Sequence, residues 1–100
     1  LIILLYEGAI KFMRLAVREL EKGNYEAKGL YINKAQDVIN ELNAVLDTDA
    51  GGEIATNLRK LYSFMCNRLS QANIKRDPQI IREVITLMEE LNQGWKAITG

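Results

Sequence analysis

Apolar residues recur along this chain at spacings of three and four residues, and the pattern is interrupted at three places. The interruptions, residues 22–24, 48–52 and 73–78, are rich in Gly, Asn, Asp and Pro, which break helices and favour turns. In the third break, Asp77 is suited to cap a helix, and Pro78 fits the first helical position because its missing N–H is not needed there. We therefore predict helices at about 1–21, 25–47, 53–73 and 78–98.

One apolar stripe in each segment alternates spacings of four and three residues, as packing around a bundle axis requires. We expect these stripes to form the core: Leu5, Ala9, Phe12 and Ala16; Tyr31, Ala35, Val38, Leu42 and Val45; Ile54, Leu58, Leu61, Met65 and Ala72; Ile80, Val84, Leu87, Leu91 and Ile98. No segment alternates with a period of two, so no sheet is expected. Four similar helices with short loops predict an all-α fold, an antiparallel up-down-up-down four-helix bundle, as a single domain over residues 1–100.

A second apolar stripe runs one residue C-terminal to core positions and repeats every seven residues. Its members are Tyr6, Met13 and Leu20; Ile32, Ile39 and Leu46; Ala55, Tyr62 and Leu69; Ile81, Met88 and Trp95. Two interpretations are open. The stripe either widens the helix–helix interfaces, as a third apolar heptad position usually does, or lines an apolar groove for a partner's helix.

The first segment carries a third stripe, Ile3, Ile10 and Val17, nearly opposite its core side. Isolated apolar surface residues need no explanation, but three in register form a patch. We expect a client peptide, a second subunit or a preceding N-terminal segment to cover it. The chain begins at Leu1 without a Met, so we also expect that such a leader segment belongs to the natural protein.

The charge balance and the polar residues exclude several functions. Thirteen basic and thirteen acidic residues give no net field toward nucleic acid or anionic lipid, and stacking aromatics do not accompany the basic residues of the third segment. No apolar run is long enough to span a membrane, so membrane insertion is not expected. The absence of His excludes His-based triads and His-containing zinc or di-iron sites.

Cys66 is the only cysteine, so an intrachain disulfide is impossible and a reducing compartment is indicated. In the middle of a predicted helix and without an imidazole partner, it is better interpreted as a small hydrophobe than as a nucleophile. We therefore expect no catalytic residue, metal site, cofactor, nucleic-acid partner or small-molecule substrate.

Several short motifs are similar to those of one family. Residues 5–10, Leu-Tyr-Glu-Gly-Ala-Ile, resemble the LYxGAI opening of FliS flagellar secretion chaperones, and residues 32–39 resemble the helix-two signature of the same family. Residues 51–58 resemble its GGEIAxNL element, residues 61–73 its LYxFMxxRLxxAN run, and Trp95 its near-terminal Trp. The pair Cys66-Asn67 departs from a more usual apolar–basic pair. The match follows the whole chain in order.

The resemblance implies a non-enzymatic cytoplasmic export chaperone. Members of the family bind the C-terminal segment of flagellin, prevent its premature polymerisation and pass it to the flagellar type III export apparatus. The alternative is a self-associating structural or adaptor bundle without a client peptide.

For the client we favour the seam between the second and third helices. We rank Tyr62 highest, because a phenol at a seam edge can bury its ring and keep its hydroxyl in water. The predicted partner-binding residues are Ile10, Val17, Ile32, Ile39, Ala55, Leu58, Tyr62 and Leu69.

Overall fold

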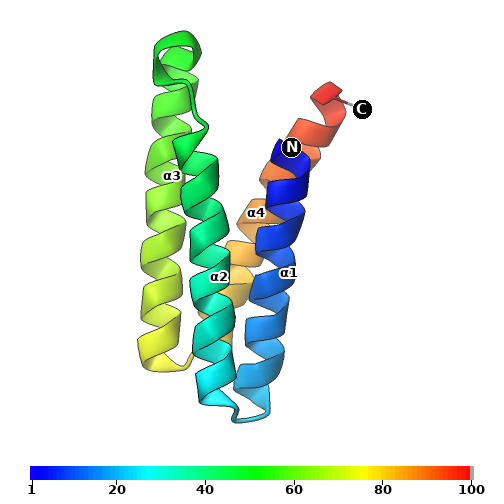
Figure 1. Ribbon diagram of the computed structural model, residues 1–100, viewed down its shortest axis with the longest axis vertical. Helices are drawn as coiled ribbons and strands as arrows, with labels where there is room; N and C mark the ends of the chain where they lie inside the picture. The colour runs from blue at the N-terminus through cyan, green and yellow to red at the C-terminus, as the bar shows by residue number, and fades with distance from the viewer. Residues whose placement is uncertain (100) are drawn as a thin grey trace.

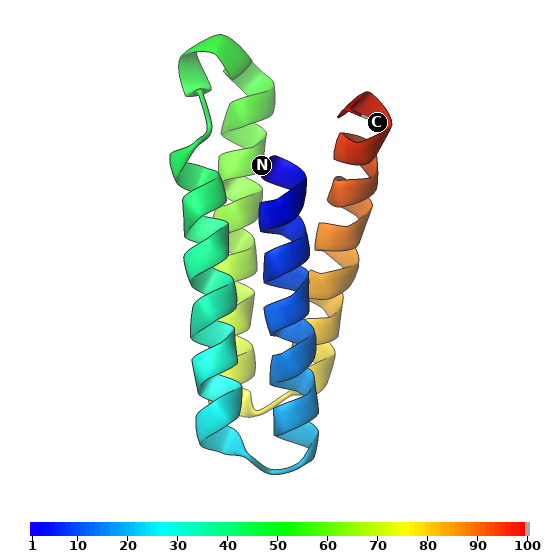
Figure 2. The same ribbon diagram turned by 45° about the vertical axis from the view of Figure 1, so that its right-hand side comes forward.

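Four antiparallel helices make up the computed structural model, which describes residues 1–99 (Figure 1). They are α1 (Ile2–Glu21), α2 (Tyr25–Ala44), α3 (Thr48–Lys75) and α4 (Pro78–Thr99). Each helix packs on the next along the chain, and α4 closes the ring by packing on α1. The α2–α3 connection and both ends of the chain lie at the upper end in Figures 1 and 2, and the other two connections lie at the lower end. The predicted all-α four-helix bundle is thus confirmed, and none of the four helices is long and apolar enough to cross a membrane.

The predicted break at 48–52 is a kink within α3 rather than a gap between helices. A helical turn begins at Thr48, because the Asp47 carboxylate accepts a hydrogen bond from the Ala50 amide at 3.0 Å. The chain then kinks at Gly52, whose φ of 54° and ψ of −127° are accessible only to glycine at low cost. At Gly51 a Cβ would lie 2.6 Å from the Ala55 Cβ, so glycine is required there by space.

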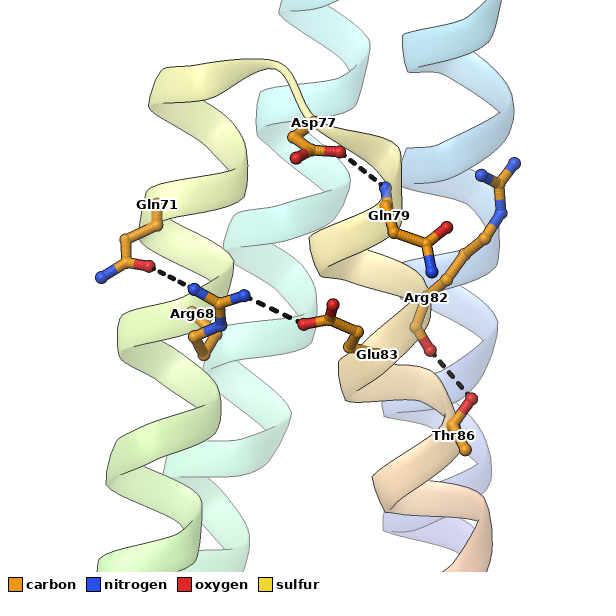
Figure 3. A network of polar contacts seen from close by, with 7 residues as sticks. All are labelled: Arg68, Gln71, Asp77, Gln79, Arg82, Glu83 and Thr86. Atoms are coloured by element: carbon orange, nitrogen blue, oxygen red, sulfur yellow. Dashed lines mark hydrogen bonds and ion pairs between the residues drawn. The ribbon is translucent and has the colours of Figure 1, made fainter.

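The other end of α3 follows the prediction more closely. Arg76 adopts the left-handed conformation, with a φ of 54°, and ends the helix. The Asp77 carboxylate then accepts a hydrogen bond from the Gln79 amide at 2.9 Å, which confirms its capping role at the start of α4 (Figure 3).

The core is displaced by one residue from the stripe that we expected to form it. In α1, and in parts of α2 and α3, large residues of the second stripe alternate at the bundle axis with alanines of the first. In α1 the buried series is Tyr6, Ala9, Met13, Ala16 and Leu20, with Val17 beside it. The corresponding buried residues are Ile32, Ala35, Ile39 and Leu42 in α2, Ala55, Tyr62, Met65, Leu69 and Ala72 in α3, and Ile80, Ile81, Val84, Ile85 and Met88 in α4.

The assignment of the whole first stripe to the core was therefore wrong for many of its large members. Val45, Ile54 and Ile98 are exposed. Others pack only at the margin of the core and are half-buried: Leu5, Phe12, Tyr31, Val38, Leu58, Leu61, Leu87 and Leu91. The reason is steric. The alanines of the first stripe let the helices approach, and near them the axis has room for large side chains mainly from the second stripe. Four large first-stripe residues are buried as predicted: Leu42, Met65, Ile80 and Val84.

A tyrosine pair links the diagonal helices α1 and α3 through the core. The hydroxyl oxygens of Tyr6 and Tyr62 lie 2.7 Å apart, and their rings meet edge to face. Trp95 of α4 also packs edge to face with Tyr6, with the ring centroids 6.4 Å apart. Burial raises the pKa of Tyr62 far above its ordinary value. Tyr62 is only 2% exposed, so the expectation that its hydroxyl stays in water was wrong.

Polar contacts fix the lower end of the bundle. The ammonium of Lys28, a buried residue near the start of α2, donates to the main-chain and side-chain oxygens of Asn73 near the end of α3. Burial lowers the pKa of Lys28, and the nearby Arg76 lowers it further. The Arg76 guanidinium in turn stacks 3.8 Å from the centroid of the Tyr25 ring. These contacts hold the two helix ends in register.

Removing one of the two tyrosine hydroxyls should destabilise the fold more than removing both. Tyr62→Phe leaves the Tyr6 hydroxyl buried without a partner, so we expect the free energy of unfolding to fall by about 1–3 kcal/mol. Tyr6→Phe/Tyr62→Phe should recover most of this loss, because both polar groups are then gone. Urea unfolding of the wild type, both single variants and the double variant measures the coupling. Additive losses would contradict the hydrogen bond.

Candidate functional site

Most of the predicted partner-binding residues lie inside the bundle. Ile10 and Leu58 are half-buried, and six are buried: Val17, Ile32, Ile39, Ala55, Tyr62 and Leu69. Of these six, Val17 lines a hollow between α1 and α4, and the role of all six in binding stays a prediction. Of the two half-buried residues, Ile10 lines the seam between α1 and α4.

The outer edge of the α2–α3 seam, where we placed the client, is polar. The Gln36 amide donates to the Cys66 carbonyl oxygen at 3.0 Å and to the Ser70 hydroxyl at 2.9 Å. Asn40 lies beside the Cys66 thiol. Burial raises the pKa of that thiol, so it stays protonated and behaves as a small apolar group. These hydrogen bonds therefore close the middle of the seam. Nearer its lower end, residues between 24 and 33, at the start of α2, and Asn73 of α3 line a hollow of about 880 Å³.

Large apolar side chains instead gather where α3 faces α4. The Arg68 guanidinium of α3 binds the Glu83 carboxylate of α4 at 2.9 Å, which marks the side on which these helices face each other (Figure 3). Leu61 lies two turns before Arg68, and Leu87 lies one turn after Glu83. Because the helices are antiparallel, both leucines lie above the ion pair on that same side. We call this strip the α3–α4 apolar margin: Ile54, Leu58, Leu61, Leu87, Leu91 and Ile98.

The margin is continuous with the core and open to solvent. Its four leucines are half-buried and pack against the core cluster, while Ile54 and Ile98 are 72% and 76% exposed. Figure 2 shows α3 and α4 diverging toward the upper end, where these two isoleucines lie on the respective helices. An apolar strip of this kind on a protein surface usually marks an interaction site.

The equivalent residues between α1 and α2 are already covered by one another. The rings of Phe12 and Tyr31 stack with their centroids 6.4 Å apart, and the Lys34 ammonium lies 5.7 Å from the Phe12 centroid. The two helices pack closely along their length (Figure 1). Of the two margins, the one between α3 and α4 is therefore the better candidate for binding.

The chemistry of the α3–α4 apolar margin is limited to burial of apolar surface. None of its six side chains can ionise or donate a hydrogen bond, and the Arg68–Glu83 pair closes its lower end. Gln71 holds the guanidinium of Arg68 from the other side at 2.7 Å. A partner that fits this strip must present apolar side chains along an extended line, as one face of an amphipathic helix does.

Sequence reasoning assigned all six margin residues to the core, and of the six it also named Leu58 as a binding residue. A usable signal was nevertheless present. In the first two segments the first stripe places an alanine between large residues, at Ala9 and Ala35. This alternation indicates that the small residues of the stripe face the bundle axis and that its large residues lie at the margin of the core.

Comparison with known proteins identifies relatives along the whole chain. The family model described as "Flagellar protein FliS" matches residues 1–100. The "Flagellar secretion chaperone FliS" of Salmonella typhimurium is 45% identical over 100 residues, covering 99% of this chain and 74% of the relative. The proteins of the same name from Vibrio cholerae and Bacillus subtilis are 39% and 36% identical, covering 95% and 96% of this chain and 70% and 71% of theirs. These relatives are chaperones and not enzymes.

Charges placed in the margin should be tolerated better than charges in the core. Leu61→Asp removes one half-buried leucine side chain and should lower the free energy of unfolding by about 1–2 kcal/mol. Ile39→Asp buries an unpaired carboxylate, which costs several kcal/mol and approaches the whole stability of a small domain. Thermal melting followed by circular dichroism compares the two. Equal loss of structure in both variants would show that Leu61 belongs to the core.

Proposed function

Since the chain belongs to the FliS family of flagellar secretion chaperones, we propose that it binds the C-terminal segment of flagellin along the α3–α4 apolar margin. It holds this segment in the cytoplasm, prevents premature polymerisation and keeps the flagellin competent for the flagellar export apparatus. The observation that carries the proposal is the strip of six large apolar side chains that the bundle leaves partly or fully exposed.

The dimensions of the margin suit a helical client. From Leu87 to Ile98 the strip follows α4 for about 17 Å, the length of three helical turns. A helix laid between α3 and α4 would bury residues at every third or fourth position against the leucines. The uncharged strip supplies no strong electrostatic attraction, so apolar burial provides most of the affinity.

The same burial accounts for chaperone activity. A segment that is disordered before export must lose conformational entropy when it becomes helical on the bundle, and a wide apolar contact offsets this cost. The client residues that contact the margin are those that would otherwise contact other flagellin molecules. Covering them blocks self-association without any chemical step, so neither a catalytic residue nor a cofactor is needed.

Binding of a flagellin C-terminal peptide should show the thermodynamics of apolar burial. We expect a clearly negative heat-capacity change in calorimetry, a gain of helix in the peptide and little loss of affinity at moderate salt. Leu61→Asp/Leu87→Asp should weaken binding at least tenfold. Ile74→Asp is the matched control, because Ile74 is an exposed apolar residue of α3 at the end opposite the margin.

Three results would contradict the proposal. Binding without a heat-capacity change, or lost at moderate salt, indicates an electrostatic contact elsewhere. Equal losses in the margin variant and in Ile74→Asp show that the margin is not the site. A chain that forms dimers through the margin and ignores the peptide supports the alternative, a self-associating structural protein.

A further inference from the structure

The seam between α1 and α4 lies on the other flank of α4 from the α3–α4 apolar margin. It contains two neighbouring hollows, of about 530 Å³ and 400 Å³. Ile10 and Leu15 contribute apolar floor to the larger hollow, and Val17 and Ile85 contribute it to the smaller one. Arg14 lines both hollows and divides them. The larger hollow follows α1 from Glu7 to Arg18, about 17 Å or three helical turns.

The lining of these hollows is distinctly basic in a chain with no net charge. Two of the lining residues are acidic, Glu7 and Glu89, and each already pairs across the seam, with Lys96 and Arg14 respectively. The basic lining residues are Lys11, Arg14, Arg18, Arg82 and Lys96.

Two of these cations have no carboxylate across the seam. Lys11 makes no ion pair within residues 1–99, and Arg18 reaches only its neighbour Glu19, at 3.5 Å. Arg82, by contrast, is bound by Glu21 at 2.8 Å. The seam therefore presents uncompensated positive charge on the α1 side above an apolar floor, which favours an acidic partner.

A buried amide in the same seam lacks a partner. Asn92 of α4 is 5% exposed and lines the larger hollow, and its Oδ1 accepts no hydrogen bond within the described residues. An unpaired buried acceptor costs about 1–3 kcal/mol. The Asn92 side-chain amide can rotate about χ2. A hydrogen-bond donor that enters the hollow can therefore pair with Oδ1 and recover part of the free energy lost by leaving this atom unpaired.

We propose that the α1–α4 seam is a second docking surface, which receives an acidic amphipathic helix from another protein. Apolar side chains of that helix would sit over Ile10 and Leu15, its carboxylates would bind Lys11 and Arg18, and a polar side chain near its centre would pair with Asn92. The surface is independent of the flagellin site, because no residue of the α3–α4 apolar margin lines it.

The shape of the seam favours a helix over other acidic partners. Single-stranded nucleic acid is usually bound with aromatic side chains that stack on the bases, and none lines either hollow. A membrane surface favours a protruding apolar face, whereas the apolar residues here form the floor of a concave seam. A helix supplies both carboxylates and apolar side chains at matching intervals.

A designed peptide tests the surface directly. The probe is a 15-residue helical peptide with Leu at every third or fourth position, one central Gln and Glu on both flanks; in its control every Glu is replaced by Gln. Binding to the full chain is measured by fluorescence anisotropy and mapped by amide chemical shifts. Lys11→Glu/Arg18→Glu is compared with Lys60→Glu/Lys75→Glu, which makes the same charge change at exposed positions of α3.

The acidic peptide should bind and shift amides of residues 7–18 and 82–96. The seam variant should lose at least tenfold in affinity, the control variant less than twofold, and both should bind the flagellin peptide normally. Asn92→Leu should raise the melting temperature and yet weaken binding of the acidic peptide. If Asn92 had only a structural role, the substitution would not weaken peptide binding.

Several outcomes would overturn the proposal. These are absence of peptide binding, equal losses in the two charge variants, tight binding of the Gln control peptide, and shifts confined to the α3–α4 apolar margin. Seam-dependent binding to phosphatidylglycerol vesicles in place of the peptide would assign the seam to a lipid surface instead.

Discussion

Limited space along the bundle axis determines the rest of this structure. Close approach of the helices depends on alanines at Ala9, Ala16, Ala35 and Ala72, and between these positions the axis admits one set of large side chains. Tyr6, Met13, Ile32, Ile39, Tyr62 and Met88 and their neighbours fill that space completely. Close packing then leaves room for few large residues of the adjoining stripe, such as Leu42 and Met65, and most of the others lie at the margins.

Those displaced residues are the source of the surface available for binding. Between α1 and α2 they cover one another, as Phe12 and Tyr31 do. Between α3 and α4 they remain open, because the helices diverge above the Arg68–Glu83 pair (Figure 2). The lower end is meanwhile held by the buried Lys28 and by the stacked Arg76 and Tyr25. These contacts thus fix the lower end of the bundle, and the α3–α4 apolar margin extends toward the upper end.

Sequence patterns predict the four helices, the turn at 22–24 and the cap at Asp77, because these depend on local chemistry, but they place the second connection at 48–52, which is a kink within α3. They do not determine which of two adjacent stripes faces the axis, since Leu5 and Tyr6 differ by one residue and both stripes fit a helical period. That choice depends on how four helices fill space together. The same ambiguity left open whether Ile32, Ile39, Tyr62 and Leu69 form helix–helix interfaces or a groove, and the structure places all four in the core. The burial of Lys28 also depends on a distant residue, Asn73, and has no local signal.

The central claim is that the displaced leucines, and not the axial residues, contact the client. The most direct measurement uses methyl-labelled Leu and Ile in the full chain with a spin label on a flagellin C-terminal peptide. The account predicts strong broadening of the methyl signals of Leu58, Leu61, Leu87 and Leu91, with Ile32 and Leu69 much less affected. Broadening centred on Ile32, Ile39 and Leu69 would show that the client enters the α2–α3 seam, and would contradict it.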